Sequence, residues 1–250
     1  MNRRIRTSGL HFLISAGIAV LAGSVVFFLW YPPPYSSFAG GLTLFAMLVG
    51  IDVVVGPCLT AVIAGPSKPK GELQRDIGVI ALLQLVAFGY GMYTIAIARP
   101  VHLVFEVDRF RVVSAADIEP EQLEKALPRF QQLPWTGPTL IGTRKSASQA
   151  EMARSLDLGL QGADVAMQPG RWVDYAAIKD SVLLKARPAA QLLEKYPQEA
   201  NAVRAVAAGH GVALQDLRFL PLEARKASGV ALVASPDARI VGYLAVEGFF

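Results

Sequence analysis

Residues 38–64 read FAGGLTLFAMLVGIDVVVGPCLTAVIA, an apolar run that contains a single charged residue, Asp52. Two further apolar runs lie on either side of it, at residues 10–30 and 77–98. Each run is long enough to cross the hydrocarbon core of a bilayer, about 30 Å thick, as an α-helix. The sequence therefore predicts three transmembrane helices, which make up a membrane region over residues 1–99.

The remaining residues, 100–250, have the mixed polar and apolar sequence of a folded domain. Apolar runs bounded by turn residues predict strands at both ends of this region, with helical stretches between them. The strands are expected at 101–107, 110–113, 217–222, 230–234 and 239–246, and the helices at 120–132, 147–157, 174–184, 188–195 and 198–208. The predicted fold class is three N-terminal transmembrane helices followed by an α+β domain with a small antiparallel sheet.

The net charge of the chain is +4, and the excess of basic residues lies outside residues 99–250. It comes from Arg3, Arg4 and Arg6 before the first run and from Lys68, Lys70 and Arg75 between the second and third. Because basic loops stay in the cytoplasm, the amino terminus and the 65–76 loop are expected there. The 100–250 domain then lies in the periplasm of a bacterium, and the protein is a multi-pass inner-membrane protein. A nucleic-acid partner is not expected.

The first run also has the features of a secretory signal, since Val20-Leu21-Ala22 is a tolerable cleavage site after the basic residues. The run continues without interruption to Trp30 and Tyr31, and such aromatic residues mark the membrane interface of an anchored helix. We therefore expect the first helix to be retained.

Asp52 is the residue whose position needs an explanation. A charged side chain at the centre of a bilayer costs at least about 2.5 to 3.5 kcal/mol, so it is kept neutral, paired or turned toward a partner. In one interpretation Asp52 has a structural role. Its side chain is then protonated, or hydrogen-bonded to Gln84, to Thr60 or to a backbone carbonyl that Pro57 leaves without a donor. In the other, it faces a partner helix and pairs with a polar group there.

Glycines surround Asp52 and recur on the third run. Small residues let two helix backbones approach closely, which is the main force of helix association in lipid. Pro57 also predicts a kink, because it cannot donate a backbone hydrogen bond to the carbonyl of Val53. The predicted partner-binding surface consists of Gly50, Asp52, Gly56, Pro57, Gln84, Gly89 and Gly91.

Motifs of catalysis are absent from the sequence. An intramembrane aspartyl protease needs two neighbouring carboxylates, but Asp52 lies about 18 Å from the helix end at which Asp76 sits. His11, His102 and His210 are too widely spread to converge on one metal, and Cys58 is the only cysteine. We therefore expect no catalytic residue, no metal site and no cofactor, and the protein is interpreted as a non-enzyme.

Several blocks of the sequence together resemble the type IV pilin accessory proteins of the TfpX/TfpZ family. The dense part of the match runs from about residue 10 to residue 117, with Cys58 in place of an expected leucine. The matching blocks are Trp30-Tyr31-Pro32, GIDVVVGPCLT at 50–60, the Lys-Pro-Lys loop, DIGVIALLQ at 76–84, Gly89-Tyr90-Gly91, and Arg99-Pro100-Val101 through to Asp108-Arg109-Phe110.

The resemblance implies a chaperone-like accessory factor that stabilises a type IV pilin and assists its assembly into the pilus. In that role the glycine-lined helix faces hold the membrane helix of the pilin, and the 100–250 domain contacts its periplasmic head. The implied partners are the pilin and the lipid bilayer. A scaffold or sensor subunit of another envelope complex would have the same topology and remains the alternative.

Overall fold

The computed structural model describes residues 3–64 and 69–250, so that Lys68 lies outside the described residues. The chain divides into two compact units. The first comprises Met1–Ser36 and Gly40–Arg99, and the second comprises Ser37–Ala39 and Pro100–Phe250. The start of the second predicted run, Phe38 and Ala39, thus groups with the α+β domain.

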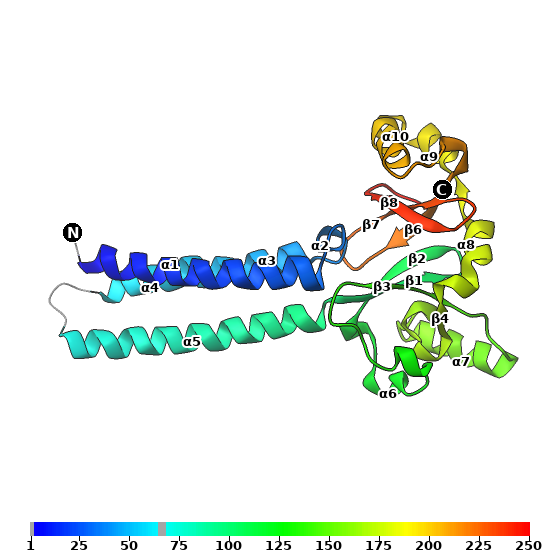
Figure 1. Cartoon of the computed structure of the whole chain (residues 1–250). Helices are drawn as coiled ribbons and strands as arrows, with labels where there is room; N and C mark the ends of the chain where they lie inside the picture. The colour runs from blue at the N-terminus through cyan, green and yellow to red at the C-terminus, as the bar shows by residue number, and fades with distance from the viewer. Residues whose placement is uncertain (1–2, 65–68) are drawn as a thin grey trace. The chain divides into compact units, whose positions relative to one another are not determined.

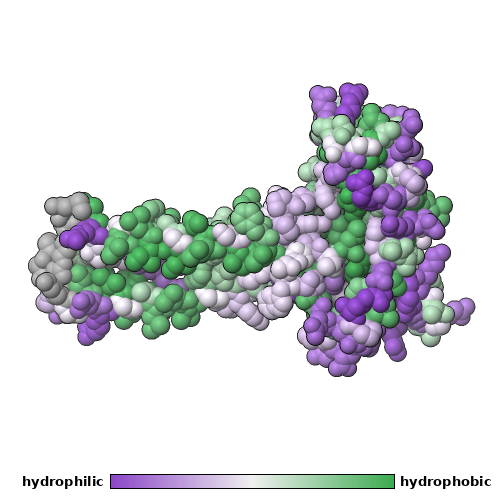
Figure 2. Space-filling model, viewed as in Figure 1, coloured by the Kyte–Doolittle hydropathy of each residue, from purple (hydrophilic) through white to green (hydrophobic). Residues whose placement is uncertain are grey.

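The first unit consists of three long helices, which confirms the three apolar helices predicted from the sequence (Figure 1). Residues Ile5–Trp30, Gly41–Ile63 and Gly71–Ile97 are candidate membrane spans by length and composition. On the face seen in Figure 2, apolar residues cover much of the surface of these helices. The elements are α1 (Arg3–Ser24), the π-helix η1 (Val25–Trp30), α3 (Gly41–Val49), the π-helix η2 (Gly50–Val55), α4 (Gly56–Ile63) and α5 (Lys70–Ile97). The short helix α2 (Tyr35–Phe38) begins in the first unit and ends in the second.

The first two spans pack antiparallel, since α1 contacts α4 while η1 contacts α3. The third span, α5, contacts both α3 and α4. It begins at Lys70, earlier than the predicted residue 77, because the polar residues of its first turns continue the helix ahead of the apolar run. The three spans thus form one helical bundle in which the middle span contacts both others.

The second unit contains an eight-stranded mixed sheet, whereas the sequence predicts a small antiparallel one. The order along the sheet is β4-β3-β1-β2-β6-β7-β8, with β5 paired to β6. The β1–β3 and β2–β6 pairs are parallel, and the others are antiparallel. The strands are β1 (Pro100–Glu106), β2 (Arg109–Ser114), β3 (Thr139–Thr143), β4 (Trp172–Asp174), β5 (Arg187–Pro188), β6 (Leu217–Glu223), β7 (Ser228–Ala234) and β8 (Arg239–Leu244).

The helices of the second unit are short and lie between β2 and β6 in the chain. The predicted helix at 120–132 is only one turn of α-helix followed by a 3₁₀ turn, because Pro128 interrupts it. The α-helices are α6 (Pro120–Leu123), α7 (Gln149–Leu160), α8 (Lys179–Lys185), α9 (Ala189–Lys195) and α10 (Ala200–Gly209). The 3₁₀ turns are η3 (Ala115–Asp117), η4 (Pro128–Phe130), η5 (Val165–Met167), η6 (Pro169–Arg171), η7 (Tyr175–Ile178), η8 (Pro197–Glu199) and η9 (Leu214–Asp216).

The sheet buries two hydrophobic clusters. One lies between β6, β7 and β8 and the helices α9 and α10, with Phe219 and Leu192 fully buried in it. The other surrounds Trp172 and draws on β1, β2 and β3. Full burial of a large apolar side chain stabilises a fold by about 1.5 to 3 kcal/mol. These clusters give the second unit a core of its own.

Phe38 and Ala39 are also buried in the second unit, although they precede the rest of it by a long stretch of sequence. The carbonyl oxygen of Phe38 accepts a 3.0 Å hydrogen bond from the backbone N–H of Lys226. The Phe38 ring is buried over Gly229, where an added Cβ would lie 2.7 Å from Cε1 of the ring and 2.6 Å from the Leu244 carbonyl oxygen. Gly229 therefore has no room for a side chain while Phe38 is in place.

Candidate functional site

Asp52 lies beside a cavity of about 460 Å³ within the first unit. All three spans contribute to the cavity, and most of its lining is apolar. Its polar side chains include those of His11, Asp52, Thr60 and Gln84. The other lining residues are Thr7, Leu10, Ile14, Ser15, Ile18, Ile77, Ala81, Leu85 and Phe88.

The π-helix η2 determines how Asp52 is bonded. In a π-helix the carbonyl of residue i accepts a hydrogen bond from the N–H of residue i+5, and for Asp52 that residue is Pro57, which has no N–H. The Asp52 carbonyl oxygen instead accepts a 3.1 Å hydrogen bond from Nε2 of Gln84 on α5. Gln84 therefore satisfies the backbone group that Pro57 leaves free, and it ties the second span to the third.

A second polar pair joins the first and second spans. Nδ1 of His11 lies 2.6 Å from Oγ1 of Thr60, which is fully buried. Thr60 follows Asp52 by eight residues, so the two side chains share one face of the span. Asp52 also interacts electrostatically with His11. The sequence interpretation assigned no role to His11, because its bond depends on how α1 packs against α4.

Two acceptors in the site have no partner among the described residues, Oδ1 of Asp52 and Oε1 of Gln84. Both atoms are buried. A buried polar atom without a hydrogen bond costs roughly 1 to 3 kcal/mol, so the site is suited to a ligand that brings a donor to it. The combination of apolar walls with a few convergent polar groups is typical of a binding pocket.

The glycines of the predicted surface fall into two classes. A Cβ on Gly56 would lie 2.0 Å from Nε2 of Gln84, and one on Gly91 would lie 2.5 Å from Cδ1 of Leu48. These two glycines serve packing within the bundle. Gly50 and Gly89, by contrast, have no described atom within 4 Å of an added Cβ and are exposed, so their backbone remains accessible to a partner.

This difference between the glycines predicts the effects of two matched substitutions. In Gly56→Ala the new methyl group displaces the Gln84 amide and breaks its bond to the Asp52 carbonyl, which is expected to cost about 0.6 to 2 kcal/mol. Gly50→Ala adds the same methyl group to the same span without a contact. Thermal unfolding of the detergent-solubilised protein is expected to show a lower Tm for Gly56→Ala alone, and equal Tm values would contradict the geometry.

The cavity contains one carboxyl group, that of Asp52, and Asp76 is not part of its lining. A protease dyad requires two carboxyl groups that share a proton. Within residues 3–64 and 69–250, no group of three or more potential metal ligands is found either. The arrangement is that of a pocket that accepts hydrogen bonds inside a helical bundle.

Fold and site together define a membrane protein with three spans, a polar pocket among them and an α+β domain after them. The model of the family "Fimbrial assembly protein FimB" matches residues 1–40. The chain is 36% identical over 246 residues to the fimbrial assembly protein of serogroup I of Dichelobacter nodosus, a match that covers 98% of this chain and 95% of the relative. It therefore belongs to the family of fimbrial assembly proteins.

Other relatives from the same organism agree with this assignment. The fimbrial assembly protein of serogroup E1 is 34% identical over 245 residues, which is 98% of this chain and 95% of the relative. That of serogroups C1 and C2 is 45% identical over 121 residues, which is 48% of this chain and 92% of the relative. No solved structure matches the chain.

Proposed function

We propose that this chain is an inner-membrane accessory protein of the chaperone kind, which stabilises a type IV pilin subunit and assists its assembly into the pilus. The relatives carry the name of fimbrial assembly proteins, and blocks of the sequence resemble the TfpX/TfpZ pilin accessory family. A pilin subunit of that kind resides in the membrane as one long apolar helix with a globular head, so a stabilising partner needs a surface for the helix.

The observation that carries the proposal is the pocket around Asp52. Its apolar walls suit a helix from the membrane, and the unpaired acceptors of Asp52 and Gln84 suit a polar group on that helix. Gly89 follows the lining residue Leu85 by one turn of α5, so the two share a face. The accessible backbone at Gly89 therefore extends this lining and allows close helix packing.

We further propose that the amino terminus is cytoplasmic and that the α+β domain is periplasmic. The basic residues Arg3, Arg4, Lys70 and Arg75 all lie at or near the starts of α1 and α5, and basic residues favour the cytoplasmic side. Residues 37–39, which follow the first span, belong to the same compact unit as residues 100–250, which follow the third. This grouping supports the proposal, because three crossings would put both segments on the same side of the membrane.

We propose a binding role without catalysis. The pocket offers one carboxyl group and hydrogen-bond acceptors, which can hold a polar group but do not form a dyad. No cofactor is needed for this role. A scaffold or sensor subunit of another envelope complex is the competing function, and the occupant of the pocket distinguishes the two.

Photo-crosslinking from the pocket tests the proposal. Leu85 and Leu83 are both exposed leucines of α5, but only Leu85 lines the pocket. A photoreactive phenylalanine analogue at position 85 is expected to capture the pilin in intact membranes, and the same analogue at position 83 is expected to capture much less. Capture of other envelope subunits without pilin would support the scaffold, and equal capture from both positions would contradict a specific pocket.

A further inference from the structure

A second cavity, of about 640 Å³, lies in the α+β domain and is independent of the membrane site. It is formed by α7, by the loop that follows β3 and by the 3₁₀ turn η6. Four basic side chains line it, those of Lys125, Arg144, Arg154 and Arg171, against a single carboxylate. The cavity therefore has a large excess of positive charge.

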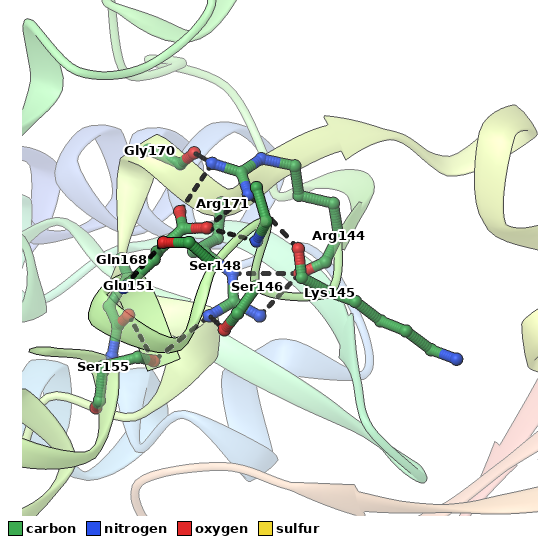
Figure 3. Close-up of polar contacts among 10 residues, drawn as sticks. Arg144, Lys145, Ser146, Ser148, Glu151, Ser155, Gln168, Gly170 and Arg171 are labelled. Atoms are coloured by element: carbon green, nitrogen blue, oxygen red, sulfur yellow. Dashed lines mark hydrogen bonds and ion pairs between the residues drawn. The ribbon is translucent and has the colours of Figure 1, made fainter. Parts of the chain in front are cut away.

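The single carboxylate, that of Glu151, already forms an ion pair with Arg144. Figure 3 shows it facing Arg144, whose two terminal nitrogens donate hydrogen bonds of 2.9 and 2.7 Å to its oxygens. The backbone N–H of Ala147 donates a third. These bonds, chiefly that from Arg144, lower the pKa of Glu151 to about 2, so it stays ionised and compensates Arg144.

Arg171 is buried and its guanidinium contacts no carboxylate among the described residues (Figure 3). It donates hydrogen bonds to neutral acceptors, namely the Arg144 carbonyl oxygen, at 2.6 and 2.9 Å, and the hydroxyl oxygens of Ser146, at 3.0 Å, and Ser155, at 3.2 Å. These bonds orient the guanidinium, but they do not neutralise its charge. It interacts electrostatically with the Glu151 carboxylate, which is already hydrogen-bonded to Arg144. A buried charge without its own counter-charge is costly, and an anion in the cavity removes that cost.

Two further cations at the cavity are exposed and available to a ligand. The side chain of Arg154 has no hydrogen bond or ion pair within the described part of the chain. Within the described residues, the side chain of Lys125 donates a hydrogen bond to the neutral side chain of Gln122, at 2.7 Å, and to no carboxylate. One buried and two exposed cations thus surround the cavity, and none of the three forms an ion pair with a carboxylate of the described residues.

The apolar part of the lining narrows the class of ligand. Ala150, Leu158 and Pro169 contribute to the walls, which favours a ligand with aliphatic surface over a small, strongly hydrated anion. The volume lies in the range of about 300 to 1,000 Å³ that is usual for ligand sites, and a guanidinium binds a carboxylate with two parallel bonds. We propose that this cavity binds the carboxylate side chains of an acidic peptide segment of a partner protein.

Fluorescence anisotropy with the full-length protein in detergent micelles tests this proposal. The probe is a fluorescein-labelled peptide with four glutamates and two leucines, and the control probe has glutamines in place of the glutamates. Arg154→Gln is expected to weaken binding of the acidic probe about tenfold, because it removes a charged hydrogen-bond donor. Arg204→Gln removes the same charge from an exposed position on α10, and is expected to change binding by less than about twofold.

Competition at constant ionic strength distinguishes carboxylates from phosphates. Glutarate is expected to displace the acidic probe at lower concentration than inorganic phosphate does. Failure of the probe to bind, equal losses in the two arginine variants, or stronger competition by phosphate would overturn the proposal. None of these outcomes depends on whether the membrane pocket binds a pilin.

Discussion

Replacement of Asp52 by alanine is expected to lower the cellular level of the pilin and the number of pili, while the abundance of the mutant protein stays the same. In the proposed function the carboxylate accepts a hydrogen bond from a polar group of the pilin helix through its unpaired Oδ1 atom. A hydrogen bond to a charged group contributes about 1.5 to 3 kcal/mol, which corresponds to a loss of affinity of about tenfold or more. Immunoblots of pilin and of this protein in the same membranes measure both quantities.

Asp52→Asn is the matched variant for this experiment, because asparagine keeps the size of the side chain and one acceptor oxygen. It is expected to retain more pilin than Asp52→Ala. If the Asp52→Ala protein itself disappears from the membrane, the carboxylate is needed for the fold of the bundle, and its role is structural.

Acid is expected to destabilise the α+β domain through His102. This side chain is buried on β1, with its ring edge against Trp172 at a centroid distance of 4.6 Å and Nδ1 bonded to Oγ1 of Thr139 at 2.7 Å. Its Nε2 has no partner among the described residues. Burial lowers the pKa of His102 from 6.5 to about 4, because the interior disfavours the charged imidazolium.

The sign of the pH effect follows from this lowered pKa. Between pH 6.5 and pH 4 the unfolded chain binds a proton at His102 that the folded chain does not, so the free energy of unfolding falls as the pH falls. The loss through His102 amounts to about 3 kcal/mol at pH 4. Burial also raises the pKa of Glu106, and protonation of that carboxylate opposes the effect, so the contribution of His102 must be measured as a difference between variants.

Urea unfolding followed by tryptophan fluorescence at pH 7 and pH 4 measures this difference. The unfolding free energy of the wild-type protein is expected to fall by about 3 kcal/mol more than that of His102→Gln over this interval. His210→Gln, which removes an exposed histidine from the same domain, is expected to behave like the wild type. Equal pH dependence in wild type and His102→Gln would show that His102 titrates normally in the folded protein.

The membrane helices were predictable because length and apolar composition suffice to identify a span. The mixed sheet was not, because β3, β4 and β5 are short and lie among turns, and because parallel partners such as β2 and β6 are distant in the sequence. Local sequence patterns indicate the hairpin at Asp108-Arg109, but they do not indicate pairings between distant strands. The size of the sheet therefore depends on contacts that a single sequence does not reveal.

Part of the candidate site was predictable from the composition of the apolar runs. Asp52, Pro57 and Gln84 stand out because polar or helix-breaking residues are rare in a span, and the structure brings these three together. The partnership of His11 with Thr60 required the packing of α1 on α4. No sequence pattern indicated the basic cavity of the second unit, because Lys125, Arg144 and Arg171 come from separate turns and loops.

The position of Phe38 over Gly229 has a consequence for the order in which the protein is made. Residues 37–39 leave the ribosome long before β7 is synthesised, so this part of the core cannot form until translation is almost complete. A shortened chain that begins at Pro100 would lack Phe38 and the hydrogen bond from Lys226, and would expose the apolar surface around Gly229 to water. The core of the α+β domain is thus completed by a segment that is synthesised near the start of translation.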